Sequence, residues 1–305
     1  MNMDEYFVLF REYMLVQKPS SVNTRDSYLR DVSAFLRYLE GENITSPLEV
    51  ETETVEAYVQ HLHSLNRTNS TISRNIASVR CFYKFLILRG DMQVNPAKSV
   101  KLEKEPKKLP QTLTSEEIDL LLSQPNVTEA KGCRDKAMLE LLYATGIRVS
   151  ELINLNVQDI NLRTGKLFCR GTKGVRTIPI YAKAVVAVSD YLYRMRDLIV
   201  DPDNSGDALF VNLNGSRLTR QGFWKIIKAY TAEAGITKEI TPHTLRHSFA
   251  MHLLQGGASV KDIQTMMGHA DISSTQVYVH LLDLDNHVKS VYNECHPRAD
   301  RKSVV

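Results

Sequence analysis

The residues best suited to chemistry lie between positions 241 and 280, and they are two histidines, an arginine and a tyrosine. His243 and Arg246 are three residues apart, so on a helix they would share one face. Arginine keeps its proton and can direct two N–H groups at two phosphate oxygens. Tyr278 carries a phenol with a pKa of about 10, which needs a base or a stabilised oxyanion before it attacks. These side chains suit attack by a tyrosine on a phosphodiester.

Local signals place these side chains on short helices. A Thr-Pro pair at 241–242 predicts a helix start, and two glycines at 256–257 predict its end. A second helix is predicted over 259–267, so His269 directly follows a helix end, where a side chain can turn into a cleft. A third, short helix is predicted to carry Tyr278.

A metal site is the alternative for the two nearest histidines. His243 and His247 have the i, i+4 spacing of a helical zinc site, but the metalloprotease motif also needs a glutamate after the first histidine. Here that residue is Thr244. We therefore expect no bound metal and assign His247 to packing or hydrogen bonding. Spacing alone does not identify Tyr278 as a nucleophile, because most tyrosines at such positions are simply half-buried.

The blocks TPHTLRHSFAMHLL and MMGHADISSTQVYVH resemble the C-terminal signature of the tyrosine recombinase (phage integrase) family, most closely that of its Xer recombinases. ATGIRVSEL, further upstream, is similar to the family's first arginine motif. Members of this family cut DNA through a tyrosine, with two arginines, a lysine and two histidine-type positions around the phosphate. The matching positions here are Arg148, His243, Arg246, His269 and Tyr278. The resemblance implies that His243 acts as the base for Tyr278 and that His269 hydrogen-bonds the phosphate.

The resemblance also assigns roles to Glu151 and Lys173. A surface pair such as Arg148 and Glu151 contributes only a few tenths of a kcal/mol, but the motif implies that Glu151 orients Arg148 toward a phosphate. Lys173 lies at the tip of a predicted hairpin and would protonate the departing 5′ oxygen. The family's Gly-Lys-Gly is displaced here to CRGTKG, and a shifted register would put Arg170 on the lysine position. Arginine has too high a pKa to act as a general acid, so Lys173 is favoured.

Composition limits the class of protein. A chain of 305 residues predicts two domains. It contains no apolar run of about 18 residues, so we expect no membrane span, and its acidic N-terminus does not resemble a signal peptide. The four cysteines are far apart in sequence, which predicts reduced thiols in a cytoplasmic protein.

The first 108 residues divide by charge. Residues 1–56 hold five basic and eleven acidic residues, whereas residues 57–108 hold ten basic and three acidic ones. Such polarity indicates one face turned to a polyanion, although a merely solvated basic helix explains it equally well. Four helices are predicted here, over 4–16, 23–39, 55–65 and 70–88. The resemblance implies a helical core-binding domain, whose last helix would contact DNA through Thr71, Ser73, Arg74, Asn75, Arg80 and Lys84.

We expect a mainly α fold with a small β-meander (α+β). A four-helix SAM-like domain over 1–99, a charged proline-containing linker over 100–112 and a catalytic domain over 113–305 would together form a C-shaped clamp on DNA. Three strands are predicted over 157–162, 167–170 and 175–180, and another strand over 208–212.

Two further segments have predicted contacts. Thr219, Arg220 and Gln221 open a helix reaching residue 234, where they would suit phosphate or base contact; a capped core helix is the alternative, and it accounts fully for Trp224. An apolar helix over 281–292 follows Tyr278. In the family the corresponding helix docks into a neighbouring subunit, although it could equally fold back on its own domain.

The sequence therefore predicts a site-specific recombinase that joins DNA through a 3′-phosphotyrosyl intermediate and a Holliday junction, without a cofactor. It would bind double-stranded DNA at two recombination sites. There it would act as a homo-tetramer, or as a hetero-tetramer with a related recombinase. Chromosome dimer resolution and mobile-element movement both remain open. The alternatives are a nicking-closing enzyme like topoisomerase IB, a DNA-binding protein without catalysis and, as an outsider, a metal nuclease.

Overall fold

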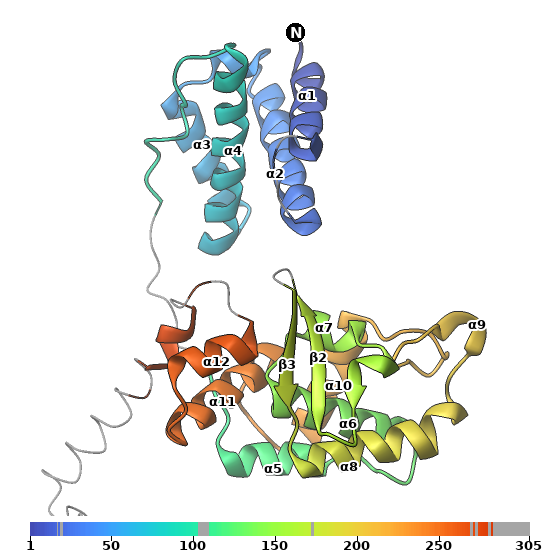
Figure 1. The fold of residues 1–305 in the computed structure, drawn as a ribbon. Coiled ribbons are helices and arrows are strands. Elements are labelled where there is room, and N and C mark those ends of the chain that lie inside the picture. The colour runs from blue at the N-terminus through green and yellow to red at the C-terminus, as the bar shows by residue number, and fades with distance from the viewer. Residues whose placement is uncertain are drawn as a thin grey trace, which may run out of the picture. The chain divides into compact units, whose positions relative to one another are not determined.

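The protein divides into two compact units, residues 1–107 and 108–305 (Figure 1). The structure, a computed structural model, describes residues 1–16, 18, 21–102, 110–171, 174–268, 271, 274–279 and 282. Part of the predicted linker and most of the predicted C-terminal helix lie outside these residues. The described residues contain no helix long and apolar enough to cross a membrane, and no group of three side chains arranged to hold a metal ion.

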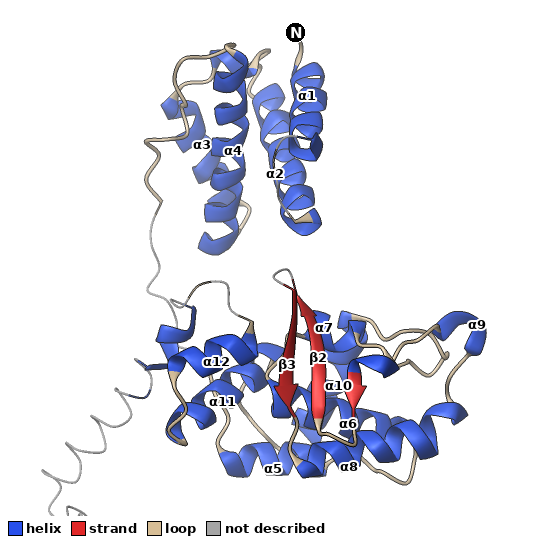
Figure 2. Cartoon of the chain, viewed as in Figure 1, coloured by secondary structure: helices blue, strands red, loops and turns tan. Residues whose placement is uncertain are grey.

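The first unit is a bundle of four helices (Figure 2). They are α1 (Met3–Val16), α2 (Val22–Gly41), α3 (Thr52–Ser64) and α4 (Asn69–Arg89). Their apolar faces meet in an aromatic core, where the ring of Phe10 lies edge-on to Phe82 and that of Phe35 edge-on to Tyr58. Burying these rings removes a large apolar area from water, which stabilises the bundle.

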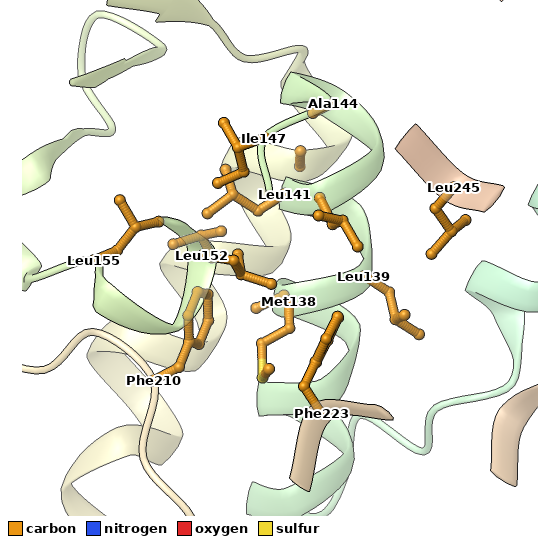
Figure 3. Close-up of a cluster of buried hydrophobic side chains, with 14 of the residues drawn as sticks. Met138, Leu139, Leu141, Ala144, Ile147, Leu152, Leu155, Phe210, Phe223 and Leu245 are labelled. Atoms are coloured by element: carbon orange, nitrogen blue, oxygen red, sulfur yellow. The ribbon is translucent and has the colours of Figure 1, made fainter. Parts of the chain in front are cut away.

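The second unit is also mostly helical and is built around α6 (Ala130–Thr145), which is buried along most of its length. Figure 3 shows Met138 and Leu139 of α6 among side chains of other elements, including Leu152, Phe210 and Phe223. The surrounding helices are α5 (Ser115–Ser123), α7 (Val149–Asn154), α8 (Ala182–Asp190), α9 (Pro202–Ser205), α10 (Arg220–Glu233), α11 (Pro242–Gln255) and α12 (Val260–Met267). A π-turn (Tyr191–Met195) and a 3₁₀ turn (Arg196–Leu198) extend α8.

One antiparallel sheet of three strands lies in this unit, in the order β1 (Ile160–Asn161), β2 (Lys166–Gly171), β3 (Gly174–Pro179). Leu167 pairs with Ile160 on one side and with Ile178 on the other. The predicted mainly helical fold with a small meander is confirmed. The first predicted strand is shorter than expected, because Val157–Asp159 forms a 3₁₀ turn. Residues 208–212 form only isolated bridges, so no full strand is present there.

Two glycines end the helices that lead into the site. Gly146 closes α6 with φ of 56°, and a Cβ at this position would lie 2.2 Å from the ring of Phe249. Gly268 closes α12 with φ of 64°, and a Cβ there would lie 2.9 Å from the guanidinium of Arg176. Both positions require a left-handed backbone and leave no room for a side chain. The absence of a side chain lets Phe249 pack against the end of α6 and lets Arg176 approach the end of α12.

Candidate active site

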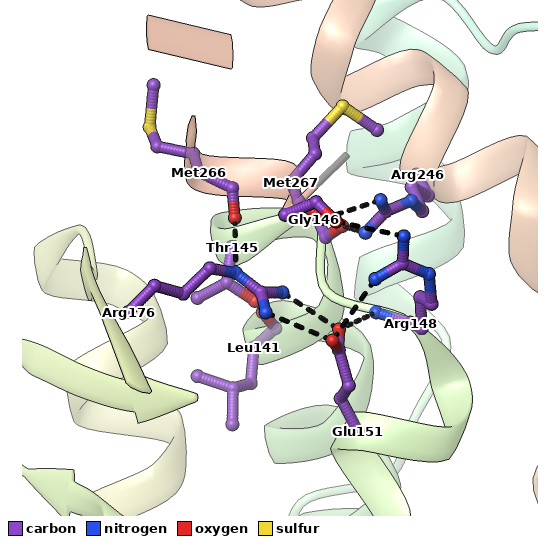
Figure 4. A network of polar contacts seen from close by, with 10 residues as sticks. Leu141, Thr145, Gly146, Arg148, Glu151, Arg176, Arg246, Met266 and Met267 are labelled. Atoms are coloured by element: carbon purple, nitrogen blue, oxygen red, sulfur yellow. Dashed lines mark hydrogen bonds and ion pairs between the residues drawn. The ribbon is translucent and has the colours of Figure 1, made fainter. Parts of the chain in front are cut away.

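Three arginines converge on the C-terminal end of α12, each from a different element (Figure 4). Arg176 of β3 donates its Nε–H to Met266 O at 2.8 Å, and Arg246 of α11 donates to Met267 O at 2.7 Å. Arg148, just before α7, donates to Gly268 O at 3.1 Å. The last carbonyls of a helix lack partners within the helix and carry partial negative charge, so they attract cations. The end of α12 thus gathers three guanidinium groups in one place.

Glu151 of α7 is the carboxylate within this group. It accepts two hydrogen bonds from Arg176, at 3.0 and 2.8 Å. It also accepts one from the side chain of Arg148 at 3.2 Å and one from the backbone N–H of Arg148 at 2.7 Å. Burial disfavours the charged carboxylate, but the hydrogen bonds and charges of Arg176 and Arg148 outweigh it and lower the pKa of Glu151. Two of the three guanidinium groups bond to this one carboxylate, and the third, that of Arg246, donates to two carbonyls instead, which leaves a net positive site.

Arg246 is the buried member of the group, and the carbonyl of Gly146 also accepts a hydrogen bond from it. Burial, followed by the charge of Arg148, lowers the pKa of Arg246 to about 10. The side chain of Arg148 is by contrast 42% exposed. One arginine is therefore fixed inside the protein while the other can reach a ligand.

A cleft of about 820 Å³ opens beside these arginines. Arg148, His243 and Arg246 line it together with the first turns of α10. Desolvation, followed by the charges of Arg246, Arg220 and Arg148, lowers the pKa of His243. From α10, the cleft is lined by Arg220, Gln221, Trp224 and Lys225. A cleft with this many cationic groups suits a polyanion.

Trp224 is not a core residue. Its side chain is 45% exposed, and it borders the cleft with Lys228 5.3 Å from the centre of its ring. The alternative of a capped core helix, which placed this tryptophan in the interior, therefore does not hold at Trp224. Thr219 does cap α10, since its hydroxyl accepts the N–H of Gly222 at 3.0 Å.

Tyr278 belongs to a helical segment, residues 274–279, and is only 2% exposed. Its hydroxyl lies 2.6 Å from Nδ1 of His247, and it packs in a cluster with Phe249, Ile263 and Met267. Burial raises the pKa of Tyr278, while the nearby charge of Arg246 lowers it. The tyrosine is therefore held inside the unit against α11, and its partner His247 directly follows Arg246 on that helix.

Lys173 and His269 lie outside the described residues. The structure does describe Arg170, the alternative to Lys173. Arg170 lies on β2 and donates to Asp159 at 3.3 and 3.2 Å. Its side chain is thus engaged by a carboxylate on the adjoining 3₁₀ turn.

The residues predicted to contact DNA from α4 divide into two groups. Asn75 is buried and bonded to Asp31 and Tyr58. Arg80 donates to the carbonyls of Ala97 and Val100 at 2.8 and 2.7 Å. These two side chains are engaged within the unit, and we leave them out of the proposal below. The side chains closer to solvent, of which Thr71 is partly buried, are Thr71, Ser73, Arg74 and Lys84. Arg74 is paired with Asp31, but 43% of its side chain remains exposed.

Arg176 was not among the residues predicted from the sequence, and His247 was predicted to pack or to form a hydrogen bond. Arg176 makes three side-chain hydrogen bonds in the network, and His247 contacts the hydroxyl of Tyr278. The sequence contains one signal for Arg176. Arginine is long and charged, and here it stands on a short strand between Val175 and Thr177, three positions after Lys173 in the sequence.

Comparisons with known proteins identify the family of this chain. Residues 111–284 match the phage integrase family, and residues 7–90 match the phage integrase N-terminal SAM-like domain. The chain is 44% identical to the tyrosine recombinase XerD of Oceanobacillus iheyensis, over 95% of this chain and 97% of that protein. It is 39% identical to the tyrosine recombinase XerC of Roseiflexus castenholzii, over 99% and 96%.

Solved structures give the same result for the fold. A crystal structure of XerA recombinase is 29% identical, with a TM-score of 0.53 over 97% of this chain and 99% of the other. XerH recombinase in a post-cleavage complex with palindromic difH substrate has a TM-score of 0.76 over 95% and 90%. Its identity is 19%, so this second likeness concerns the fold alone.

Proposed function

The chain belongs to the phage integrase family as a tyrosine recombinase of the Xer type, and from this premise we propose that it cuts and rejoins DNA at specific sites through a 3′-phosphotyrosyl intermediate. One observation carries the proposal. Arg148 and Arg246 line a single cleft, and the hydroxyl of Tyr278 lies 2.6 Å from Nδ1 of His247, the residue that follows Arg246 on α11. This unit thus brings an anion site and a phenol together.

The two arginines would bind the scissile phosphate. Arg246 is buried and held by two carbonyls, so it offers a fixed charge. Arg148 is anchored by Glu151 and Gly268, yet much of its side chain remains open to the cleft. Fixed cations stabilise the charge that builds on the non-bridging oxygens of the pentacovalent transition state, without reorganising during the reaction.

In the covalent step, the Tyr278 oxygen forms a bond to phosphorus and the bond from phosphorus to the 5′ oxygen breaks. Lys173 would protonate the departing 5′ oxygen. His243, which lines the cleft, and His269 would hydrogen-bond the phosphate. The energy of the broken bond is kept in the phosphotyrosine, so a 5′ hydroxyl from another strand can reverse the step without ATP.

DNA contacts would come from both units. Arg220 and Gln221, in the first turn of α10, line the cleft and would contact the backbone or bases together with the N-cap residue Thr219. The accessible residues of α4 (Thr71, Ser73, Arg74 and Lys84) would contact a second stretch of the duplex. We propose that four subunits, identical or paired with a related recombinase, act in the cytoplasm on two sites through a Holliday junction. The C-terminal helix of each would dock on its neighbour.

The experiment begins with a pool of nicked duplexes of random sequence, because the natural site is unknown. Wild type incubated with the pool in a chelator should capture a subset of duplexes as SDS-resistant adducts at a 3′ end. Sequencing those adducts identifies the preferred site. Tyr278→Phe, which keeps the ring but lacks the hydroxyl, should bind the selected duplex and form no adduct.

The outcomes separate the alternatives. An adduct formed by Tyr278→Phe would show that another residue is the nucleophile. Binding without an adduct in wild type would favour a DNA-binding protein. An adduct that yields relaxed plasmid but no exchanged strands between two selected sites would favour a topoisomerase-like enzyme. Dependence of the adduct on added Mg²⁺ would favour a metal nuclease.

A further inference from the structure

The hydroxyl of Tyr278 has one close partner among the described side chains, Nδ1 of His247 at 2.6 Å. His247 follows Arg246 directly on α11, so the partner of the nucleophile and the anchor of the phosphate are neighbours in the chain. We propose that His247 is a catalytic residue that takes the phenolic proton of Tyr278 as the tyrosine attacks phosphorus. This inference rests on the recombinase function proposed above.

A base is needed because Tyr278 lies inside the unit. With 2% of its surface exposed, the phenol has little access to water that could accept the proton. Burial also raises the pKa of Tyr278 above its usual value of about 10. The phenol therefore keeps its proton near neutral pH, and a positioned acceptor within hydrogen-bond distance meets the geometric requirement for general base catalysis.

His243, the other described histidine near the cleft, is placed differently. It is exposed and lines the cleft where the phosphate would bind. Its ring centre is 6.4 Å from that of His247, and among the described residues no hydrogen bond joins it to Tyr278. The ring centre of His247 is 5.5 Å from that of Tyr278. The expectation that His243 serves as the base for Tyr278 therefore transfers to His247.

The surroundings of His247 keep its ring neutral. Burial, followed by the charges of His243 and Arg246, lowers the pKa of His247 to about 4. A neutral ring has a free lone pair, as an acceptor must. A phosphate anion bound by Arg148 and Arg246 would offset the positive charges nearby and make the ring more basic. The phenol becomes more acidic as its bond to phosphorus forms, so the proton can move during the attack and not before it.

The step balances as follows. The Tyr278 Oη–H bond breaks and its proton goes to the lone pair of His247 Nδ1. The Oη–P bond forms, the P–O5′ bond breaks, and O5′ takes a proton from the general acid proposed above, Lys173. In the rejoining step an incoming 5′ hydroxyl replaces Oη on phosphorus, and Oη recovers its proton from His247. No oxidant, metal or nucleotide is consumed.

The test substitutes His247→Asn, because an asparagine Oδ1 can accept the tyrosine hydrogen bond but cannot take up the proton. The probe is the nicked duplex selected by wild type, at saturating protein. We expect adduct formation to fall about 100-fold or more, with DNA affinity and melting temperature close to those of wild type. Between pH 7 and 9 the residual rate should rise about tenfold per pH unit, following the phenolate fraction, while wild type shows a smaller slope. The other titratable or charged groups facing His247 are His243, Arg246 and Tyr278.

A duplex with sulfur in place of the bridging 5′ oxygen tests the base and the general acid separately, because a thiolate leaves without taking up a proton. The defect of His247→Asn should persist on it. Wild-type or faster cleavage by His247→Asn would overturn the proposal, as would a defect that the sulfur duplex abolishes or a pH slope equal to wild type. His247→Gln, a neutral side chain of similar volume, serves in the same assays if the asparagine variant melts early. Failure of wild type to form the adduct would instead contradict the proposed function.

Discussion

Each unit of the chain contains a cluster of polar side chains around a carboxylate, at Asp31 in the first and at Glu151 in the second, and these two clusters differ in charge. In the first unit, Asp31 of α2 is buried and accepts hydrogen bonds from Arg74, Asn75 and Ser78 of α4. In the second unit, Glu151 accepts hydrogen bonds from Arg148 and Arg176. Arg246 lies beside them and donates to a carbonyl at the same end of α12. The first cluster has one arginine for its carboxylate and the second has three.

This difference separates a structural cluster from an anion site. The charges around Asp31 cancel, and three donors satisfy the buried carboxylate, so the cluster ties α2 to α4 without needing a ligand. The charges around Glu151 do not cancel, because the carbonyls at the end of α12 supply only partial negative charge. The catalytic unit therefore maintains positive charge that a bound phosphate would neutralise.

The largest expected effect comes from two arginines with matched exposure. The side chains of Arg148 and Arg74 are 42% and 43% exposed, and each is paired with an acid. Arg148→Ala should lower the cleavage rate of bound duplex by about 10³-fold, because it removes a donor to the transition state. Arg74→Ala should leave that rate unchanged and weaken binding, reducing the slope of log affinity against log salt by about 0.9.

Single-turnover cleavage at saturating protein measures the cleavage rate, and binding titrations at several salt concentrations measure the salt dependence of affinity. A cleavage defect in Arg74→Ala would contradict this division of roles.

The two carboxylates provide the next test. Glu151→Gln should destabilise the second unit by about 3 kcal/mol, because two arginines lose their shared counter-charge, and it should also slow cleavage. Asp31→Asn should destabilise the first unit by about 2 kcal/mol, as buried donors lose a charged acceptor, with cleavage of bound DNA retained. Hydrogen exchange can assign each loss to its unit. Equal cleavage defects in the two variants would remove the distinction between the clusters.

A smaller effect is expected on the hairpin. Arg176→Met removes three hydrogen bonds that join β3 to Glu151 and to α12, so we expect a loss of about 2 kcal/mol in stability and about tenfold slower cleavage (a shift of ~1.4 kcal/mol). Arg170→Met is the control on the neighbouring strand. Its side chain is mostly exposed, so its stability should change by less than about 0.5 kcal/mol. Thermal melts and cleavage rates measure both variants, and a severe cleavage defect in Arg170→Met would favour the shifted register over Lys173.

The smallest effect is a difference in pH dependence. The folded-state pKa of Glu151 is lowered relative to the usual 4.5. Its contribution to stability is therefore fully present above pH 4.5 and is lost as the pH falls through the folded-state value. Urea unfolding of wild type and Glu151→Gln between pH 6 and 3.5 should show stability curves that converge toward acid. Parallel curves would show that the pKa of Glu151 is the same in the folded and unfolded states.

Much of the fold could be predicted because its signals are local. The helix start at Thr241 and Pro242 is present as the sequence indicated, with Thr241 as the cap. The end of α12 at Met267 also matches the predicted helix over 259–267. These features depend on hydrogen bonds within about four residues, so the order of side chains determines them.

Contacts between distant segments were harder to predict. The polar side chains of α4 suggested one DNA-facing row, but Asn75 points inward because Asp31, on another helix, offers it a partner. Arg80 bonds to carbonyls that lie 17 and 20 residues after it in the chain, beyond the end of its own helix. Polarity along a helix does not show whether a side chain meets solvent or a buried acceptor, because that depends on which element packs against it.

The sequence by itself determined the family, the mainly helical fold, and the residue types suited to phosphodiester chemistry, since these follow from motifs and local periodicity. The tertiary structure decided which of those residues meet. It brings Arg148, Arg176 and Arg246 from three elements to consecutive carbonyls of α12, and it sets His247 against Tyr278 across 31 positions of sequence. Such contacts depend on how helices and the hairpin pack around α6, and no local pattern encodes the distance between two side chains on separate elements.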